Sequence, residues 1–135
     1  VVPAALPAPT DIYLYEDRAA VVATLAYRRV PGLRPTPDTG YALILTEIFD
    51  AGHPFIEKIL HSGATADAVS VAGHRGVFIA GPQEVLMEHD GDLTSPVLPR
   101  SSANTLIWGG AVTFRLEADA GRRAALRLGE QITPR

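Results

Sequence analysis

The sequence predicts an α+β domain in which two helices pack against an antiparallel sheet of about seven or eight strands. Three observations lead to this prediction. Apolar and polar residues alternate in several short segments, which is the period of a strand. Glycine and proline separate these segments at short intervals. The last apolar residues of the chain recur every three to four positions, which is the period of a helix.

The expected strands are short and are distributed over most of the chain. They are residues 11–15, 19–27, 41–49, 69–71, 77–80, 84–89, 105–108 and 112–117. The third of these is apolar on both faces, so it should lie inside the sheet with both faces covered. Residues 31–40 and 90–103 are rich in polar residues, glycine or proline and are expected to form loops.

The last two strands surround Gly109 and Gly110 and should form a hairpin. A strict two-residue turn would pair Ile107 with Val112. A loop one residue longer gathers the large apolar residues on one face: Leu106, Trp108, Val112, Phe114 and Leu116. Because register tends to follow the hydrophobic pattern, we expect the longer loop, with Trp108 buried on the same face as Phe114.

Two helices are expected from the spacing of apolar residues. The first covers residues 54–61 and turns Phe55, Ile56, Ile59 and Leu60 inward. The second covers residues 120–132 and buries Ala125, Leu128, Gly129 and Ile132. Glycine is unfavourable inside a helix, so its presence at position 129 indicates a close approach between helix and sheet.

Length and composition indicate one domain. The chain has 135 residues, of which residues 1–10 form an extended lead-in rich in proline and alanine and residues 11–135 form a single α+β domain. Apolar residues make up 47% and charged residues 20%, which is typical of a protein with a packed core. The longest apolar runs are shorter than the ~18 residues needed to cross a membrane.

Charge and cysteine content exclude several kinds of function. The net charge is −3, and the densest basic group before the last helix, Arg28, Arg29 and Arg34, follows three acidic residues. These arginines are expected to be a solvated edge, so nucleic acid is not an expected partner. The chain contains no cysteine, which excludes disulfides, thiolate metal sites and cysteine nucleophiles.

The strongest candidates for metal ligands are His53, Glu57 and His61. Their spacing of four residues puts them on one face of a helix, but the outer two would be about 12 Å apart and could not reach the same ion. The pattern also lacks the adjacent His and Glu of a zincin motif. We therefore expect a solvated helix face that binds no metal.

Other candidate motifs favour turns and exposed positions over chemistry. No serine lies in a G-x-S-x-G elbow; the serines considered are Ser62, Ser70, Ser95, Ser101 and Ser102. Residues 90–92 (Asp-Gly-Asp) resemble the start of a calcium loop without its later ligands, so a hairpin turn is expected. Residues 73–76 (Gly-His-Arg-Gly) fit a tight turn better than a phosphate loop, because no helix follows them. No catalytic, cofactor-binding or metal-binding residue is predicted.

Four segments together resemble a known pattern. Residues 69–82 are similar to a "V-x-V-x-G-x-x-G-aromatic-x-x-G" signature, and residues 104–108 to an "N-T-L-x-W" strand. Residues 114–117 and 125–132 are similar to a closing "R-L-E … A-L-R-I-A-E-S-I". The chain thus resembles a bacterial extracytoplasmic domain family found in membrane-anchored, anti-sigma-factor-like proteins. Gly129 and Gln131 depart from that pattern, which has alanine and serine there.

The resemblance implies a non-catalytic sensory or interaction domain on the extracytoplasmic face of a bacterial membrane, with anti-sigma-factor-type signalling in some relatives. It also implies an apolar helix of about 20 residues before Val1, since the chain has no initiator and opens with a proline-rich tether. The partner would be a protein or a small ligand. The alternative is a carrier of small apolar ligands or lipids; a hydrolase is the least favoured. An enclosed apolar pocket would favour the carrier, and a shallow exposed apolar patch the partner-binding domain.

Overall fold

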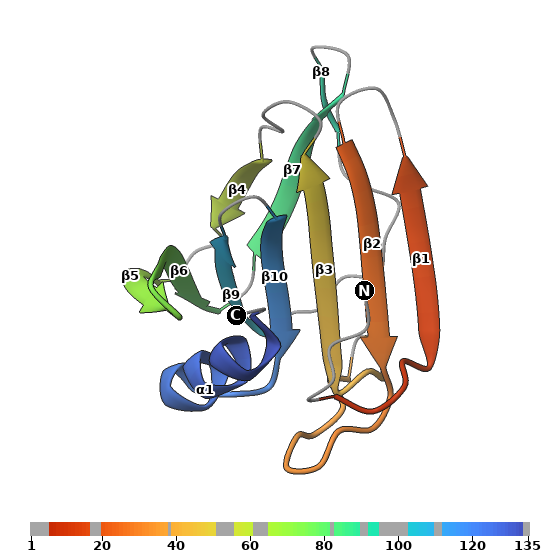
Figure 1. Cartoon of the computed structure of the whole chain (residues 1–135), viewed down its shortest axis with the longest axis vertical. Coiled ribbons are helices and arrows are strands. Elements are labelled where there is room, and N and C mark those ends of the chain that lie inside the picture. Colours follow the sequence, from red (N-terminus) through yellow and green to blue (C-terminus); the bar gives the residue numbers. More distant parts are fainter. Residues whose placement is uncertain are drawn as a thin grey trace.

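A seven-stranded antiparallel sheet forms the body of the protein (Figure 1). The computed structural model describes residues 6–16, 20–37, 39–50, 56–60, 65–81, 83–89, 92–94, 103–109 and 112–133. The strands of this sheet are β1 (Asp11–Glu16), β2 (Ala20–Tyr27), β3 (Leu43–Asp50), β5 (Thr65–Val71), β6 (His74–Ala80), β9 (Asn104–Gly109) and β10 (Val112–Ala118). Their order is β1-β2-β3-β10-β9-β6-β5, so β1 and β5 are the two edge strands. The predicted antiparallel sheet is confirmed.

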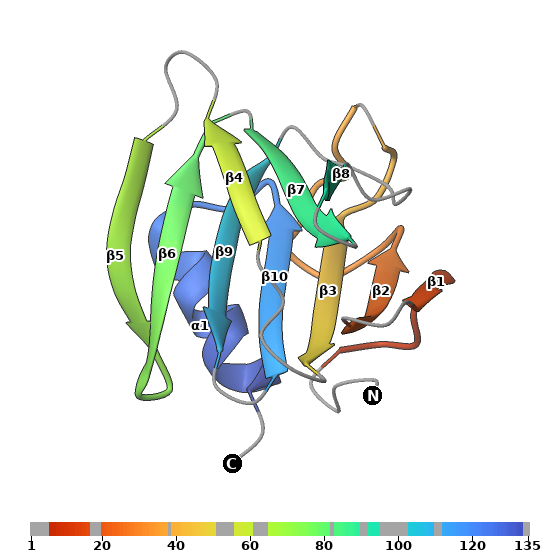
Figure 2. The same cartoon turned by 90° about the horizontal axis from the view of Figure 1, so that it is seen from above.

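Two further elements cover the large sheet. A three-stranded antiparallel sheet contains β4 (Ile56–Leu60), β7 (Gln83–His89) and β8 (Asp92–Thr94), with β7 in the middle. Helix α1 (Arg122–Ile132) packs on β9, β10 and β5. Figure 2 shows α1 on one face of the large sheet and the small sheet over the opposite face. The residues of β3 from Leu43 to Ile48 are all buried, so both of its faces are covered, as the sequence predicted.

The helix predicted at residues 54–61 is wrong where the structure describes it, because Ile56–Leu60 is strand β4. This strand pairs antiparallel with β7, Lys58 opposite Val85. The periods of a helix and of a strand cannot be told apart in an apolar run this short. A helix of fewer than about 12 residues is also marginal without strong packing. The two isoleucines of the segment favour a strand because they are β-branched. The predicted helix at residues 120–132 is correct but begins two residues later, at Arg122.

The hairpin of β9 and β10 has the predicted common face but a different pairing. Phe114 lies opposite Trp108, and Leu116 lies opposite Leu106. Trp108 is 1% exposed, and its ring stacks on Phe114 with centroids 5.2 Å apart. The alternation therefore identified the shared face correctly. The expected loop would pair Trp108 with Val112, and the observed pairing is shifted by two residues from it.

Close packing between α1 and the sheet explains the glycine in the helix. A Cβ atom added at Gly129 would lie 2.9 Å from Val71 Cγ1 and 3.0 Å from Leu106 Cδ2. On the sheet side, a Cβ at Gly76 would lie 2.6 Å from the carbonyl oxygen of Ile107. All three distances are shorter than van der Waals contact, so a side chain at either position would force neighbouring atoms to shift.

Hydrogen bonds fasten the ends of α1 to β9. The Trp108 indole Nε1 donates to Thr133 Oγ1 at 2.7 Å, and that hydroxyl donates to the Gly129 carbonyl oxygen at 2.6 Å. The Asn104 side chain accepts from the Gly81 backbone N–H at 3.1 Å and donates to the Ala120 carbonyl oxygen at 3.0 Å. One strand thus positions both ends of the helix and the end of β6.

Candidate functional site

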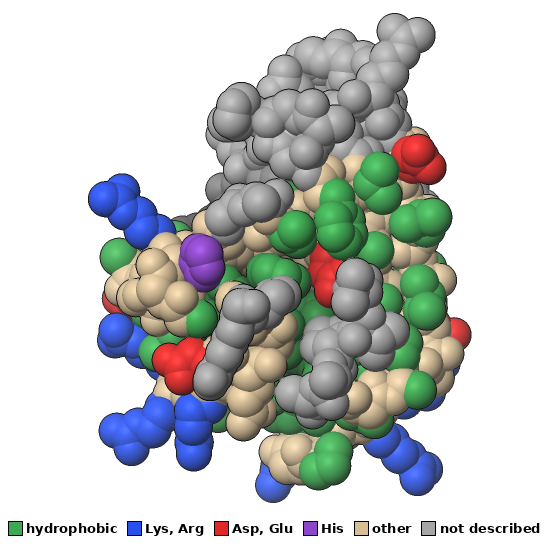
Figure 3. Space-filling model, viewed as in Figure 1, with side chains coloured by type: hydrophobic (Ala, Val, Ile, Leu, Met, Phe, Trp, Pro, Cys, Tyr) green, Lys and Arg blue, Asp and Glu red, His purple; other side chains and the backbone are tan. Residues whose placement is uncertain are grey.

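The most exposed large apolar side chains in the described part of the chain lie on edge strand β1. Ile12 is 60% exposed and Leu14 is 68% exposed. The register from β1 through β2, β3 and β10 to β9 places both on the face of the sheet against which α1 packs. In Figure 3, hydrophobic side chains follow the right-hand rim, where Figure 1 places β1, with acidic side chains among them. We call Ile12, Leu14 and the outer backbone edge of this strand the β1 surface. Its groups are accessible to an added strand, because an edge strand pairs on one side only.

A hydrogen-bond network on the other face holds β1 in place. The Tyr41 hydroxyl donates to Asp11 Oδ2 at 2.5 Å, and the Tyr13 and Tyr41 hydroxyl oxygens are 3.1 Å apart. The Arg28 guanidinium lies over the Tyr41 ring, 5.1 Å from its centroid. The bond to Asp11 raises the pKa of Tyr41 above its usual value, so Tyr41 remains a donor at all physiological pH values. The strand is therefore pre-positioned, which lowers the entropy lost when a partner pairs with it.

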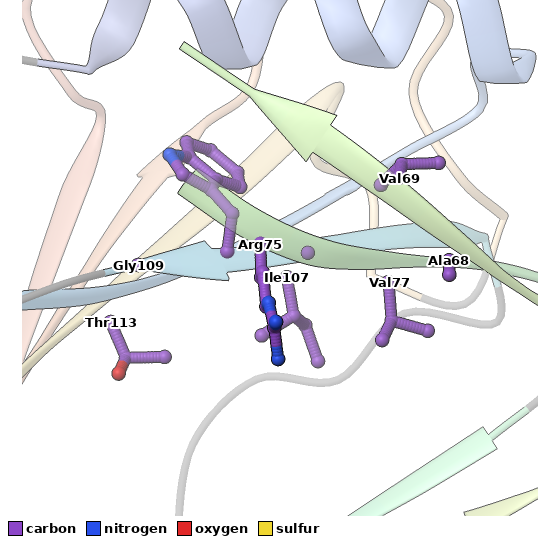
Figure 4. A pocket seen from close by; sticks show the side chains of 9 residues that line it. Ala68, Val69, Arg75, Val77, Ile107, Gly109 and Thr113 are labelled. Atoms are coloured by element: carbon purple, nitrogen blue, oxygen red, sulfur yellow. The ribbon is translucent and has the colours of Figure 1, made fainter. Parts of the chain in front are cut away.

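A second candidate site, which is concave, lies at the other end of the large sheet. Figure 4 shows this cavity of about 540 Å³, which we call the sheet-end cavity. Its lining residues come from four strands: Ala68, Val69, Arg75, Gly76, Val77, Ile107, Trp108, Gly109 and Thr113. The side chains of Arg75, Val77, Ile107 and Thr113 point to the same side of the sheet, away from α1. The lining is mostly aliphatic, and Arg75 provides its positive charge.

One ion pair lies in the interior of the sheet. Arg115 and Glu117 alternate on β10, and the Arg115 guanidinium donates to Glu117 Oε1 at 2.6 Å. Both residues are buried, and they share their face with Thr105. A buried, hydrogen-bonded pair of this kind is expensive to break by removing one partner. We interpret it as a structural feature of the fold.

The predicted absence of a metal site at His53, Glu57 and His61 stays a prediction. Glu57 lies in β4, whereas the two histidines lie outside the described residues. Among the residues that the structure does describe, no group of three or more His, Asp or Glu side chains could hold a metal ion.

The remaining sequence candidates fall at turns or outside the described ranges. Ser70 is exposed on β5, as expected; the other four serines are not described. The tight turn expected near residues 73–76 is confirmed, although Ala72 and Gly73 form it and the next three residues begin β6. His89 pairs with Asp92, which is the strand pairing that a hairpin at residues 90–92 requires, while residues 90–91 lie outside the described residues.

Sequence reasoning missed both the β1 surface and the sheet-end cavity. A signal for the first was present, because Ile12 and Leu14 alternate with polar residues in a short strand without the lysine or proline that usually protects an edge. The cavity had no such signal. Its residues come from β5, β6, β9 and β10, and only the strand order brings them together.

Comparisons with models of protein families, with curated proteins and with solved structures find no match to this chain. No helix in the described ranges has the length and apolar character needed to cross a membrane.

Proposed function

We propose that the chain is a non-catalytic sensory or interaction domain of a membrane-anchored bacterial protein, exposed on the extracytoplasmic side, and that a protein partner pairs with its β1 surface. The exposure of Ile12 and Leu14 on an edge strand is the observation on which this proposal depends. Such a patch is shallow and apolar, which is the form that a partner-binding surface takes. Signalling in the anti-sigma-factor manner, and the membrane-anchored location, rest on the resemblance of the four segments.

The partner expected from this geometry is an extended protein segment that adds a strand to β1. Its backbone would bond to the outer edge of the strand, and its alternate apolar side chains would cover Ile12 and Leu14. Asp11 and Glu16 flank the apolar pair and would disfavour acidic residues opposite them. The partner segment should therefore be apolar at alternate positions and should place no acidic residue directly opposite Asp11 or Glu16.

Site-specific photocrosslinking in the natural bacterial host tests this proposal. A photoreactive amino acid replaces Ile12 or Leu14 in the full-length protein, and exposed helix residue Arg123 serves as the control position. Adducts of defined mass from positions 12 and 14, absent from position 123, are expected. They should disappear when Tyr13→Lys introduces a charge at the strand edge. Equal labelling from all three positions, or none, would contradict a partner at β1.

Reporter fusions test the location separately. Alkaline phosphatase is active only outside the cytoplasm, and β-galactosidase only inside it. When each is fused after residue 135 of the full-length protein, phosphatase activity alone is expected. The reverse pattern would refute the extracytoplasmic location while leaving the β1 experiment unaffected.

The sheet-end cavity favours a second candidate function, that of a carrier for a small amphipathic anion. A volume of about 540 Å³ lies within the range of ligand pockets. Aliphatic residues such as Val77 and Ile107 would bury an acyl chain, and the Arg75 guanidinium would pair with a carboxylate. Titration calorimetry with dodecanoate, and with dodecanol as the uncharged control, tests this. Binding of dodecanoate alone, lost in Arg75→Leu and kept in Arg123→Leu, is expected. Equal heats for both compounds would oppose recognition of an anion by Arg75, and no heat from either would oppose a carrier.

A further inference from the structure

We propose that the partner of the β1 surface is a second copy of this chain, and that the two β1 strands pair antiparallel about a two-fold axis at Tyr13. This inference rests on the proposed interaction function and names its partner. It starts from the pattern of β1 itself. Ile12 and Leu14 lie on the exposed face of this edge strand, one residue before and one residue after Tyr13.

Sheet geometry limits how β1 can pair with itself. In an antiparallel pair, residues directly opposite one another point to the same face of the sheet. A single sheet through both copies, with both α1 helices on one face, therefore places residue 12 opposite residue 12, 14 or 16 of the second copy. A pairing shifted by one residue would instead place Ile12 opposite Tyr15, although their side chains point to opposite faces of the sheet. It would also place Asp11 opposite Glu16, where like charges repel.

Among the allowed registers, the axis at Tyr13 gives the best complement. Ile12 then faces Leu14 of the second copy, and Leu14 faces its Ile12, so four apolar side chains form one cluster. Asp11 faces Tyr15 and meets no like charge. Moving the axis to Leu14 would place Ile12 against Glu16 instead. Because only the register at Tyr13 covers all four apolar side chains with apolar partners, it is the one that we infer.

Such a dimer would bury the apolar part of the exposed edge and extend one antiparallel sheet through both copies. The interface is narrow, since each copy contributes one strand of six residues. Interfaces much smaller than about 1,000 Å² are weak or transient. Association should therefore depend strongly on local concentration, as it would if both copies were held on one membrane surface.

Disulfide trapping tests both the partner and the register, because the chain contains no cysteine of its own. Opposite residues in an antiparallel pair have Cα atoms about 4.5–5.5 Å apart, which a disulfide can bridge, whereas diagonal pairs are too far apart. Under mild oxidation, Tyr13→Cys should form a covalent dimer alone. Ile12→Cys and Leu14→Cys should each cross-link poorly alone and efficiently when mixed. Arg123→Cys, on the exposed face of α1, is the matched control.

The mixed pair keeps the hydrogen bond between Tyr13 and Tyr41, so it stands if Tyr13→Cys disturbs the fold. We expect the mixture to cross-link at least about tenfold faster than either variant alone, as the disulfide distance limits require. Cross-linking of Leu14→Cys by itself would refute the register. Rates equal to that of Arg123→Cys throughout would refute the dimer; photo-adducts from positions 12 and 14 to another protein would then still support the proposed function.

Discussion

Replacing Gly129 by leucine tests the packing of α1 against the sheet. The Cβ position at Gly129 is 2.9 Å from Val71 Cγ1, 3.0 Å from Leu106 Cδ2 and 3.5 Å from Trp108 Cη2. Valine is branched at Cβ and cannot easily turn its methyl group away. A leucine at this position would place three further carbon atoms beyond a Cβ that already overlaps its neighbours. The helix must therefore shift from β9, or the core must repack.

The expected loss can be worked from two opposing terms. Replacing glycine by alanine or leucine inside a helix stabilises it by about 0.8–1 kcal/mol, because the unfolded chain loses less freedom on folding. Overpacking of a dense core opposes this by about 1–3 kcal/mol, and by more when several atoms are added. Gly129→Ala should therefore change stability by a net loss of about 0–2 kcal/mol, and Gly129→Leu should lose about 3 kcal/mol.

Urea unfolding followed by far-UV circular dichroism and by Trp108 fluorescence measures these changes. Gln131→Leu is the matched control, because this residue is exposed on the same helix and glutamine and leucine have similar helix propensities. The control should remain within about 0.5 kcal/mol of the parent. If Gly129→Leu unfolds at the same urea concentration as the parent, α1 does not press on Val71 and Leu106, and the packing described above is wrong.

Two further substitutions test single features of the fold. Burial, with a smaller contribution from Glu47, raises the pKa of Tyr27 from 10.0 to about 12. The folded state therefore resists ionisation of Tyr27, so the free energy of unfolding is highest below pH 10 and falls as the pH rises toward 12. Tyr27→Phe should unfold less readily than the parent at pH 11. At pH 7 it should be neutral or up to about 1 kcal/mol more stable, since the hydroxyl has no hydrogen-bond partner among the described residues; a loss above about 2 kcal/mol in urea would show that this hydroxyl is bonded. Ala72, at φ 49°, precedes Gly73, at φ 83°, in the β5–β6 turn, and asparagine adopts such a conformation more readily. Ala72→Asn should raise the melting temperature by roughly 2–4 °C, and a lower value would mean that this turn is not of type I′.

The parts of the fold that could be predicted from the sequence are those in which local pattern and burial agree. Residues 41–49 are apolar on both faces, and β3 lies inside the sheet with both faces covered. The even-numbered apolar residues of β9 and β10 share one face because the side-chain period of a strand is two. In each case one pattern was compatible with only one environment.

Prediction failed where a short segment depends on a distant partner. Residues 56–60 carry apolar side chains that suit a helix or a strand, and pairing with β7 selects the strand. Strand β8 has three residues, too few to show any period, and it exists by pairing with β7. The exact register of the β9–β10 hairpin is likewise set by the neighbouring strands β3 and β6 as well as by the turn. Non-local pairing of this kind leaves no trace in a window of local sequence.

Val71, Gly76, Trp108 and Gly129 meet in one part of the core, where the two glycines bring the sheet backbone and the helix close to Trp108. A larger side chain at either glycine would overlap its neighbours, so substitutions here act on packing. The β1 surface lies at the opposite edge of the sheet, away from this contact. Substitutions at Ile12 and Leu14 should therefore alter partner binding without altering stability, whereas Gly129→Leu should alter stability first and binding only through it.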